Sequence, residues 1–129
     1  MSQYTEFRER SFKAGADFRA LQFTFVKLDT TQNQVVAATA ASDHILGIIK
    51  NAPNTGEIAN VVLCGGGEGT FKVVASTVIA LGAWLTATTG GQAVTTTADH
   101  AFVGAMALEA ATAQGDIIEV QLMAFTISA

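Results

Sequence analysis

The sequence predicts an all-β fold, a small β-barrel or sandwich built from two pseudo-repeated halves and preceded by an extended N-terminal arm. The first observation is an internal repeat, because the sequence of residues 29–63 recurs loosely at residues 86–122. The second is that apolar residues come in short runs with a period of two, which is typical of half-buried strands. The third is the frequency of turn signals between these runs, as small barrels and sandwiches require.

The repeat has three matched blocks. They are Thr30–Val36 with Thr88–Val94, the Asp-His pairs at 43–44 and 99–100, and Gly56–Leu63 with Gly115–Leu122. The offset changes from 58 to 56 and then 59 residues, so the length differences fall between the blocks, where loops tolerate them. We therefore expect one β domain over residues 18–129, with pseudo-repeats at about 18–68 and 69–129.

Residues 1–17 are polar and are expected to form the arm. A flexible arm that orders on a partner, a short amphipathic helix and a frayed terminus all fit this composition. Five of the seven basic residues of the chain lie before residue 28. The residues that we expect to bind a partner from this arm are Phe7, Arg8, Arg10, Phe12 and Lys13.

The first strand is expected from Phe18 onward, where Leu21, Phe23 and Phe25 alternate with polar residues. The polar cluster Asp29–Asn33 predicts a turn, matched by the glycines of Thr88–Gly91, and each turn leads to a short strand.

The clearest strands begin after the matched glycines Gly56 and Gly115, at Glu57–Leu63 and Asp116–Leu122. Between the two copies, residues 70–75 also alternate like a strand. The repeat therefore covers most of the predicted strands.

Residues 101–114 conflict with this reading, because their many alanines have high helix propensity. The matching segment of the first copy contains Pro53, which interrupts a helix. We follow the repeat and predict a strand and a turn here.

The chain ends with Met123, Phe125 and Ile127, whose alternation is opposite in phase to that of Ile118 and Val120. Such a change of face indicates either a bulge or a strand that is apolar on both sides. The second alternative favours a subunit interface made by these three residues.

Composition excludes several function classes. Only 14% of the residues are charged, against about 25% in an average protein, so we expect part of the surface to contact other protein. The net charge of −4 without a basic stripe speaks against direct nucleic-acid binding. No apolar run approaches the ~18 residues of a membrane span and the N-terminus has no apolar signal region, so we expect a soluble protein made in the cytoplasm.

Candidate catalytic and cofactor sites are weak. The run Cys64–Gly69 lacks the Lys-Ser/Thr end of a phosphate-binding loop, and a linker between the repeats is the simpler reading. Cys64 ends an apolar run and is expected to be a buried, inert thiol. The Asp-His pairs lack the local spacing of a zinc site, so we expect each Asp to cap a turn beside an exposed His.

Three aromatic residues, Trp84, Phe102 and Phe125, allow a binding platform for sugars or bases. They lie on apolar strands, and filling a small core is the favoured role. No residue is assigned to catalysis, to a cofactor or to a metal.

The second copy resembles the capsid decoration, or cement, proteins of tailed bacteriophages. The resemblance rests on Gly82–Thr86, Asp99–Ala111 and Gly115–Leu122, where an aspartate and a hydrophobic residue precede Gly-x-Ala and a Gly-Asp opens the last strand. It covers roughly residues 18–122, and the first copy departs from it with Gly47-Ile48-Ile49 in place of Gly-x-Ala.

This resemblance implies a structural protein without enzymatic activity on the outer surface of the virion head. It would bind the major capsid protein, stabilise contacts between its subunits and form a homo-oligomer, with a trimer favoured. The alternatives are a carbohydrate- or receptor-binding module on a virion surface and, resting on Gly65–Gly69 alone, a nucleotide enzyme.

Overall fold

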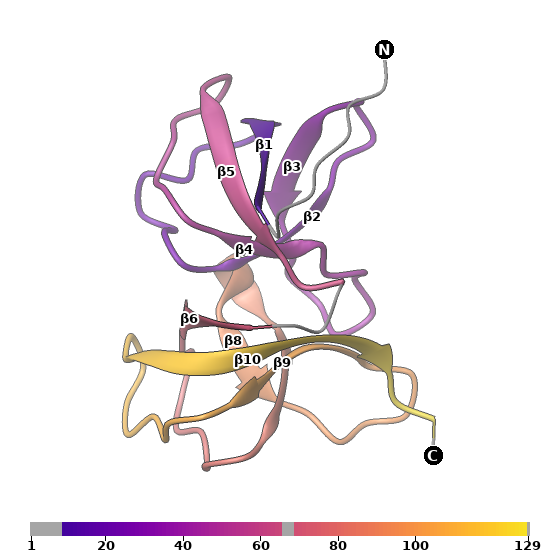
Figure 1. Ribbon diagram of the computed structural model, residues 1–129, viewed down its shortest axis with the longest axis vertical. Coiled ribbons are helices and arrows are strands. Elements are labelled where there is room, and N and C mark those ends of the chain that lie inside the picture. Colours follow the sequence, from indigo (N-terminus) through magenta and orange to yellow (C-terminus); the bar gives the residue numbers. More distant parts are fainter. Residues whose placement is uncertain (1–8, 66–68, 129) are drawn as a thin grey trace.

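The strands form two stacked halves in the computed structural model, which describes residues 9–65 and 69–128 (Figure 1). The first half contains β1 (Glu9–Ala14), β2 (Phe25–Leu28), β3 (Gln34–Ala37), β4 (Gly47–Ile49) and β5 (Ile58–Leu63). The second half contains β6 (Thr70–Val74), β7 (Trp84–Ala87), a 3-10 turn η1 (Thr89–Gly91), β8 (Ala93–Thr95), β9 (Phe102–Ala107) and β10 (Ile117–Thr126). The predicted all-β class is confirmed.

The two halves share one strand topology. The first half is a closed barrel in the order β1-β3-β2-β4-β5, in which β1 and β3 pair in parallel. The second half is a five-stranded sheet in the order β6-β10-β9-β7-β8, which is the order of the barrel opened between the counterparts of β1 and β3. A single parallel bridge between Ala75 and Ala93 takes the place of the β1–β3 pairing. The internal repeat in the sequence is therefore a repeat of this five-strand unit.

The matched turn glycines act alike in both halves. Gly56 has a φ of 86° and Gly115 a φ of 92°, a left-handed conformation that favours glycine. The amide of Gly56 donates to the carbonyl of Ala14 and that of Gly115 to the carbonyl of Ala75, both with a donor–acceptor distance of 2.8 Å. Each turn thus fixes the start of the last strand of its half.

The expected strand from Phe18 onward is wrong over its first part, because β2 begins only at Phe25. Leu21 donates its amide to the carbonyl of Phe18, and Phe23 has a φ of 61°, so the chain turns here. Phe23 packs edge-to-face on Phe71 of β6 with 5.7 Å between ring centroids. The period-two pattern therefore marks a half-buried turn at the contact between the halves.

The alanine-rich segment 101–114 forms strand β9 followed by a turn, as the repeat predicts. β9 lies between β7 and β10 and pairs with both. Hydrogen bonds to two neighbours satisfy its backbone, and this tertiary pairing outweighs the helix propensity of its alanines.

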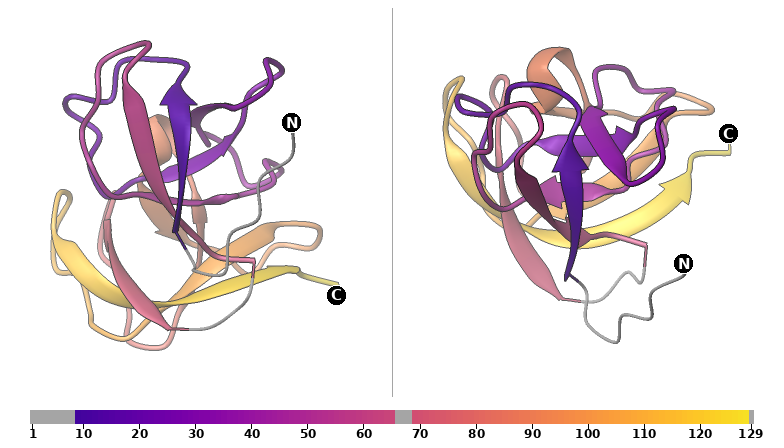
Figure 2. Two further views of the ribbon diagram at one scale, coloured as in Figure 1. Left: turned by 45° about the horizontal axis from the view of Figure 1, so that its top comes forward. Right: turned by 90° about the horizontal axis from the view of Figure 1, so that it is seen from above.

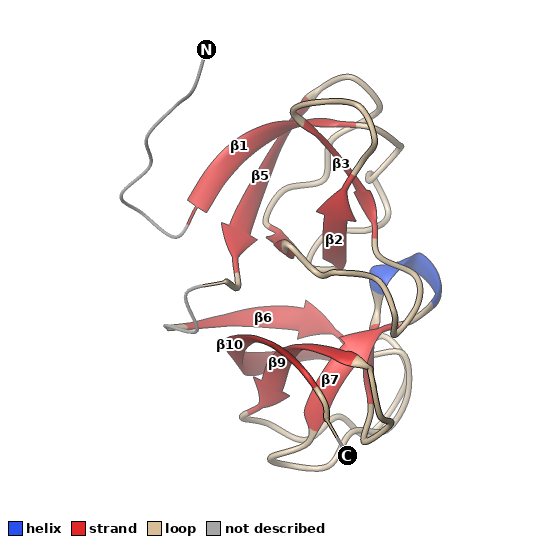
Figure 3. Cartoon of the chain, turned by 90° about the vertical axis from the view of Figure 1, so that its right-hand side faces the viewer, coloured by secondary structure: helices blue, strands red, loops and turns tan. Residues whose placement is uncertain are grey.

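The largest apolar core lies between the halves. It joins buried residues of the barrel, among them Phe25, Ile48 and Val62, to buried residues of the second sheet, among them Leu85 and Leu122. Figure 2 shows β10 crossing beneath the barrel, and Figure 3 shows the barrel strands above β6 and β10. A second core fills the barrel itself. Within the described residues, no helix is long and apolar enough to cross a membrane.

Candidate functional site

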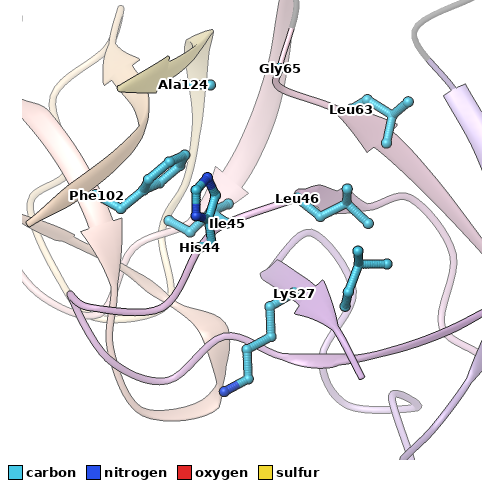
Figure 4. Close-up of a pocket in the computed structure, with 9 residues that line it drawn as sticks. Lys27, His44, Ile45, Leu46, Leu63, Gly65, Phe102 and Ala124 are labelled. Atoms are coloured by element: carbon cyan, nitrogen blue, oxygen red, sulfur yellow. The ribbon is translucent and has the colours of Figure 1, made fainter. Parts of the chain in front are cut away.

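An open pocket of about 410 Å³ lies where the two halves meet (Figure 4). The barrel contributes Leu28 of β2, Leu46 before β4 and Leu63 at the end of β5. The second half contributes Phe102 of β9 and Ala124 of β10. The pocket exists because β2, β4 and β5 all reach the same end of the barrel, where the second sheet lies against them.

The charges beside this pocket are paired. Lys27 Nζ lies 3.1 Å from Asp43 Oδ1. Asp43 Oδ2 accepts hydrogen bonds from the amides of Thr39 and Ala40 at 2.9 and 3.2 Å, and these bonds, with Lys27, lower the pKa of Asp43. The pocket is thus apolar with a neutralised rim, a surface that suits an apolar group better than an ion.

The first Asp-His pair behaves as the sequence predicts. Asp43 caps its turn as described, and His44 is exposed and packs on Phe102, with 4.5 Å between ring centroids. His100 is exposed, and its Nδ1 lies 3.2 Å from Asp99 Oδ2. Across residues 9–65 and 69–128, no three His, Cys, Asp or Glu side chains come together as metal ligands.

Cys64 is buried, and burial raises the pKa of its thiol to about 11. Its sulfur donates toward the carbonyls of Ile45 and Leu46, both at 3.4 Å. A neutral thiol of this kind is a poor nucleophile. The glycine-rich run after it joins β5 to β6, so a strand follows it, whereas a dinucleotide-binding loop opens a helix; residues 66–68 lie outside the described residues.

The expected arm is in part a strand. Residues 9–14 form β1, which pairs with β5 in five registered positions from Glu9 with Val62 to Lys13 with Ile58. Phe12 is only 6% exposed and belongs to the barrel core, so it is not available to a partner. Arg10 stacks over Phe12 and donates to Asn33, whereas Lys13 is exposed. Phe7 and Arg8 lie outside the described residues.

The C-terminal residues lie on the outer side of the second sheet. The register of β10 against β9 shifts between Leu122 and Phe125, which is the bulge that the change of phase predicts. Met123 and Phe125 are partly buried, and Ile127 is buried with Ala101 and Val103. The chain's own packing therefore covers Ile127, and Met123 and Phe125 retain surface.

Of the three aromatic candidates, Phe102 is buried in the core and Trp84 is 40% exposed. Trp84 packs edge-to-face on Phe125 with 5.1 Å between ring centroids. The core role is right for Phe102, whereas Trp84 and Phe125 form an aromatic pair at the surface.

Sequence reasoning missed the exposed apolar residues and the pocket. The largest exposed fractions belong to Leu28, Ile58, Val78, Leu81 and Ile117. Ile58 and Ile117 occupy matched positions in the two repeats, and each is the first residue of the last strand of its half. The repeat could therefore have indicated that both residues have the same environment. No sequence pattern could have indicated the pocket, because its lining residues come together only when the two halves stack.

Three comparisons with known proteins indicate the family and the fold of this chain. Among curated proteins the chain has no significant match. A similar solved structure is the head fiber gp8.5 N base of bacteriophage phi29, with a TM-score of 0.70 at 15% identity over 94% of this chain and 98% of that one. That likeness shows a shared fold. The family model for phage cement proteins matches residues 16–122. This match spans both repeats, and the chain belongs to the phage cement protein family.

Proposed function

We propose that the protein decorates the outer surface of an assembled phage head, where it binds the major capsid protein and stabilises contacts between its subunits. The match to phage cement proteins over both repeats carries this proposal. A protein that binds the assembled lattice and not its dispersed subunits stabilises that lattice by mass action. The role needs adhesive surface and no catalytic group, and we propose that the protein is not an enzyme.

The test is binding of the purified protein to expanded, undecorated heads, with the temperature of head rupture as readout. Saturating protein should raise this temperature, and an unchanged rupture temperature at saturation would contradict the proposal. The major capsid protein in dispersed form is the control, because a cement protein should bind it far more weakly.

The exposed outer side of β1 supports a contact with the shell through the basic residues near the N-terminus. Lys13 is exposed there. The sequence before β1 contains a further basic residue, Arg8, and the aromatic Phe7, both outside the described residues. The Lys13→Glu variant should bind heads more weakly than Lys72→Glu, the same charge change at the one basic residue of the described second half. Equal affinities would remove this surface from the proposal.

We also propose a homotrimer that uses the outer side of the second sheet. Trp84, Met123 and Phe125 leave apolar surface there, and identical copies bound side by side add their weak contacts. Sedimentation should show a trimer that Phe125→Asp weakens and that Thr126→Asp, on the exposed neighbouring position, leaves intact. A native protein that sediments as a monomer would contradict this.

The surface pair of Trp84 and Phe125 supports a second candidate function, binding of carbohydrate or a receptor at the virion surface. Glycans stacked on Trp84 should change its fluorescence, and Trp84 is the only tryptophan of the chain. A glycan screen without any change in this fluorescence would eliminate the candidate.

A further inference from the structure

We propose that the acidic end of the second half, formed by the turns at residues 76–82 and 108–116, is a docking surface for the head shell, and that the shell meets it with an apolar recess edged by Lys or Arg side chains. This contact presupposes that the protein decorates heads. It lies on the other half of the molecule from the basic side of β1, so it is a second point of attachment.

The two turns lie side by side at this end of the molecule (Figure 1). Ile79 and Ala111 exchange backbone hydrogen bonds of 3.0 and 2.9 Å. The amide of Gly82 donates to the carbonyl of Ala107 with a donor–acceptor distance of 2.8 Å. These bonds continue the pairing of β7 with β9 into the turns, so the acidic end has a fixed shape.

Three large apolar side chains of the acidic end are exposed to solvent. Leu81 is 70% exposed, Val78 is 64% exposed and Ile117, directly after the second turn, is 53% exposed. Ile79 lies between Val78 and Leu81 in the chain, and its own side chain is buried in the core between the halves. Large apolar residues gathered at one end of a folded protein mark a surface that another protein covers.

The charges at the acidic end are negative. Glu109 and Glu119 are exposed and Asp116 is partly exposed, and among the described residues none of the three carboxylates forms an ion pair. Lys72 lies opposite Glu119 in the ladder of β6 and β10, but its ammonium group is 4.7 Å from the centroid of the Phe23 ring. The acidic end therefore complements a cationic surface and repels an anionic one.

Backbone amides hold two of these carboxylates in place. Glu109 Oε1 accepts a hydrogen bond from the amide of Glu119 at 2.7 Å. Asp116 Oδ2 accepts from the amides of Thr112 and Ala113 at 2.8 and 3.2 Å, and the bonds from Thr112 and then from Ala113 lower the pKa of Asp116. Lys or Arg side chains of a partner would thus meet charged carboxylates that are already ordered, which reduces the entropy cost of binding.

Two attachment points of opposite charge suit a protein that holds neighbouring shell subunits together. The basic side of β1 and the acidic end belong to different halves, and the shared core joins these halves. The second contact of a molecule that is already attached forms at a high effective concentration, so two weak contacts give tight binding. Loss of either contact should therefore weaken binding to heads strongly.

Binding of variants to expanded, undecorated heads tests the apolar part of this surface. Leu81→Ser should raise the Kd for heads by roughly tenfold, because covering one leucine side chain contributes about that factor. Leu81→Met keeps the apolar volume and should bind like the wild type. The matched control is Leu28→Ser, the same change at a leucine of the barrel that is 58% exposed, and it should leave the Kd unchanged. Both leucines are largely exposed, so neither replacement disturbs the fold.

The salt dependence of head binding tests the charged part. The double variant Glu109→Gln, Glu119→Gln should bind several-fold more weakly at low salt, and its Kd should rise less with added salt than that of the wild type. Glutamine keeps the oxygen that accepts the amide of residue 119. Glu57→Gln is the matched control, because Glu57 Oε1 accepts the amide of Asn54 at 2.7 Å in a turn of the barrel, and it should not weaken binding.

The wild type separates this contact from decoration itself. A wild type that does not bind heads would contradict decoration and, with it, the contact. If the wild type binds heads and Leu81→Ser binds them equally tightly, decoration stands and the docking surface is wrong. An unchanged salt dependence in the double glutamine variant would equally overturn the cationic partner.

Discussion

Asp43 connects a sequence motif to the stability of the barrel. Its carboxylate holds the turn before β4 through the amides of Thr39 and Ala40 and pairs with Lys27. Its pKa is below the ordinary value of 3.8, so the folded state binds the proton more weakly than the unfolded chain does. This contribution to stability is therefore present above about pH 4 and is lost as the pH falls through the folded pKa.

We expect Asp43→Asn to lower the free energy of unfolding at pH 7 by about 1–2 kcal/mol, because it removes charge from these hydrogen bonds and from the pair with Lys27. The variant should also lose less stability than the wild type between pH 5 and pH 2.5. Urea unfolding at a series of pH values measures both effects. Asp29→Asn, in another turn of the barrel, controls for loss of a negative charge, and an equal acid response in all three proteins would exclude this role.

Gly47 is needed for close contact between β4 and β5. A Cβ at this position would lie 2.1 Å from the carbonyl oxygen of Val62, so the strands would have to separate. We expect Gly47→Ala to destabilise the protein by about 3 kcal/mol, at the upper end of overpacking costs. Thermal unfolding measures this, and Gly65→Ala, where an added Cβ meets nothing within 4 Å, should be close to neutral. Similar melting temperatures for the two variants would contradict the packing argument.

At the scale of elements, β1 changes the meaning of the N-terminal region. Its position in the barrel matches that of β6 in the second sheet, and it pairs with both β3 and β5. The sequence hides this strand, because the polar side of β1 carries Glu9, Ser11 and Lys13 and only Phe12 is large and apolar. The composition of residues 9–14 therefore predicted an arm, whereas in the barrel these residues form strand β1.

Two truncations separate the arm from the strand. Deleting residues 1–8 should leave the fold intact, whereas deleting residues 1–16 removes β1, opens the barrel and exposes its core. Circular dichroism and solubility of the two proteins measure the difference. A folded protein without residues 1–16 would show that β1 is dispensable.

At the scale of the molecule, the shared core makes the halves dependent on each other. Ile48 belongs to the barrel and is fully buried in the core that also contains Leu85 and Leu122. The single tryptophan, Trp84, lies in the other half and reports on it. The two halves should therefore unfold in one transition.

Ile48→Ala should lower the free energy of unfolding by about 2–5 kcal/mol, since it leaves a cavity in the shared core. The loss should appear equally in Trp84 fluorescence and in circular dichroism during urea unfolding. The exposed position Ile58, on the same half, is the control, and Ile58→Ala should have little effect. A fluorescence transition that Ile48→Ala does not move would show that the halves unfold separately.

The sequence by itself determined the β class, the two related halves, the turns at Gly56 and Gly115 and the capping role of Asp43. These features depend on local chemistry, namely period-two burial, a left-handed turn and a side chain bonded to nearby amides. Residues that are close together in the sequence are enough to predict such features. The tertiary structure alone decided that residues 9–14 are a strand, that Phe23 turns away from β2 and that Leu28, Leu46 and Leu63 line a pocket with Phe102. Each of these depends on residues far apart in the chain that meet only when the barrel closes and the second sheet packs beneath it.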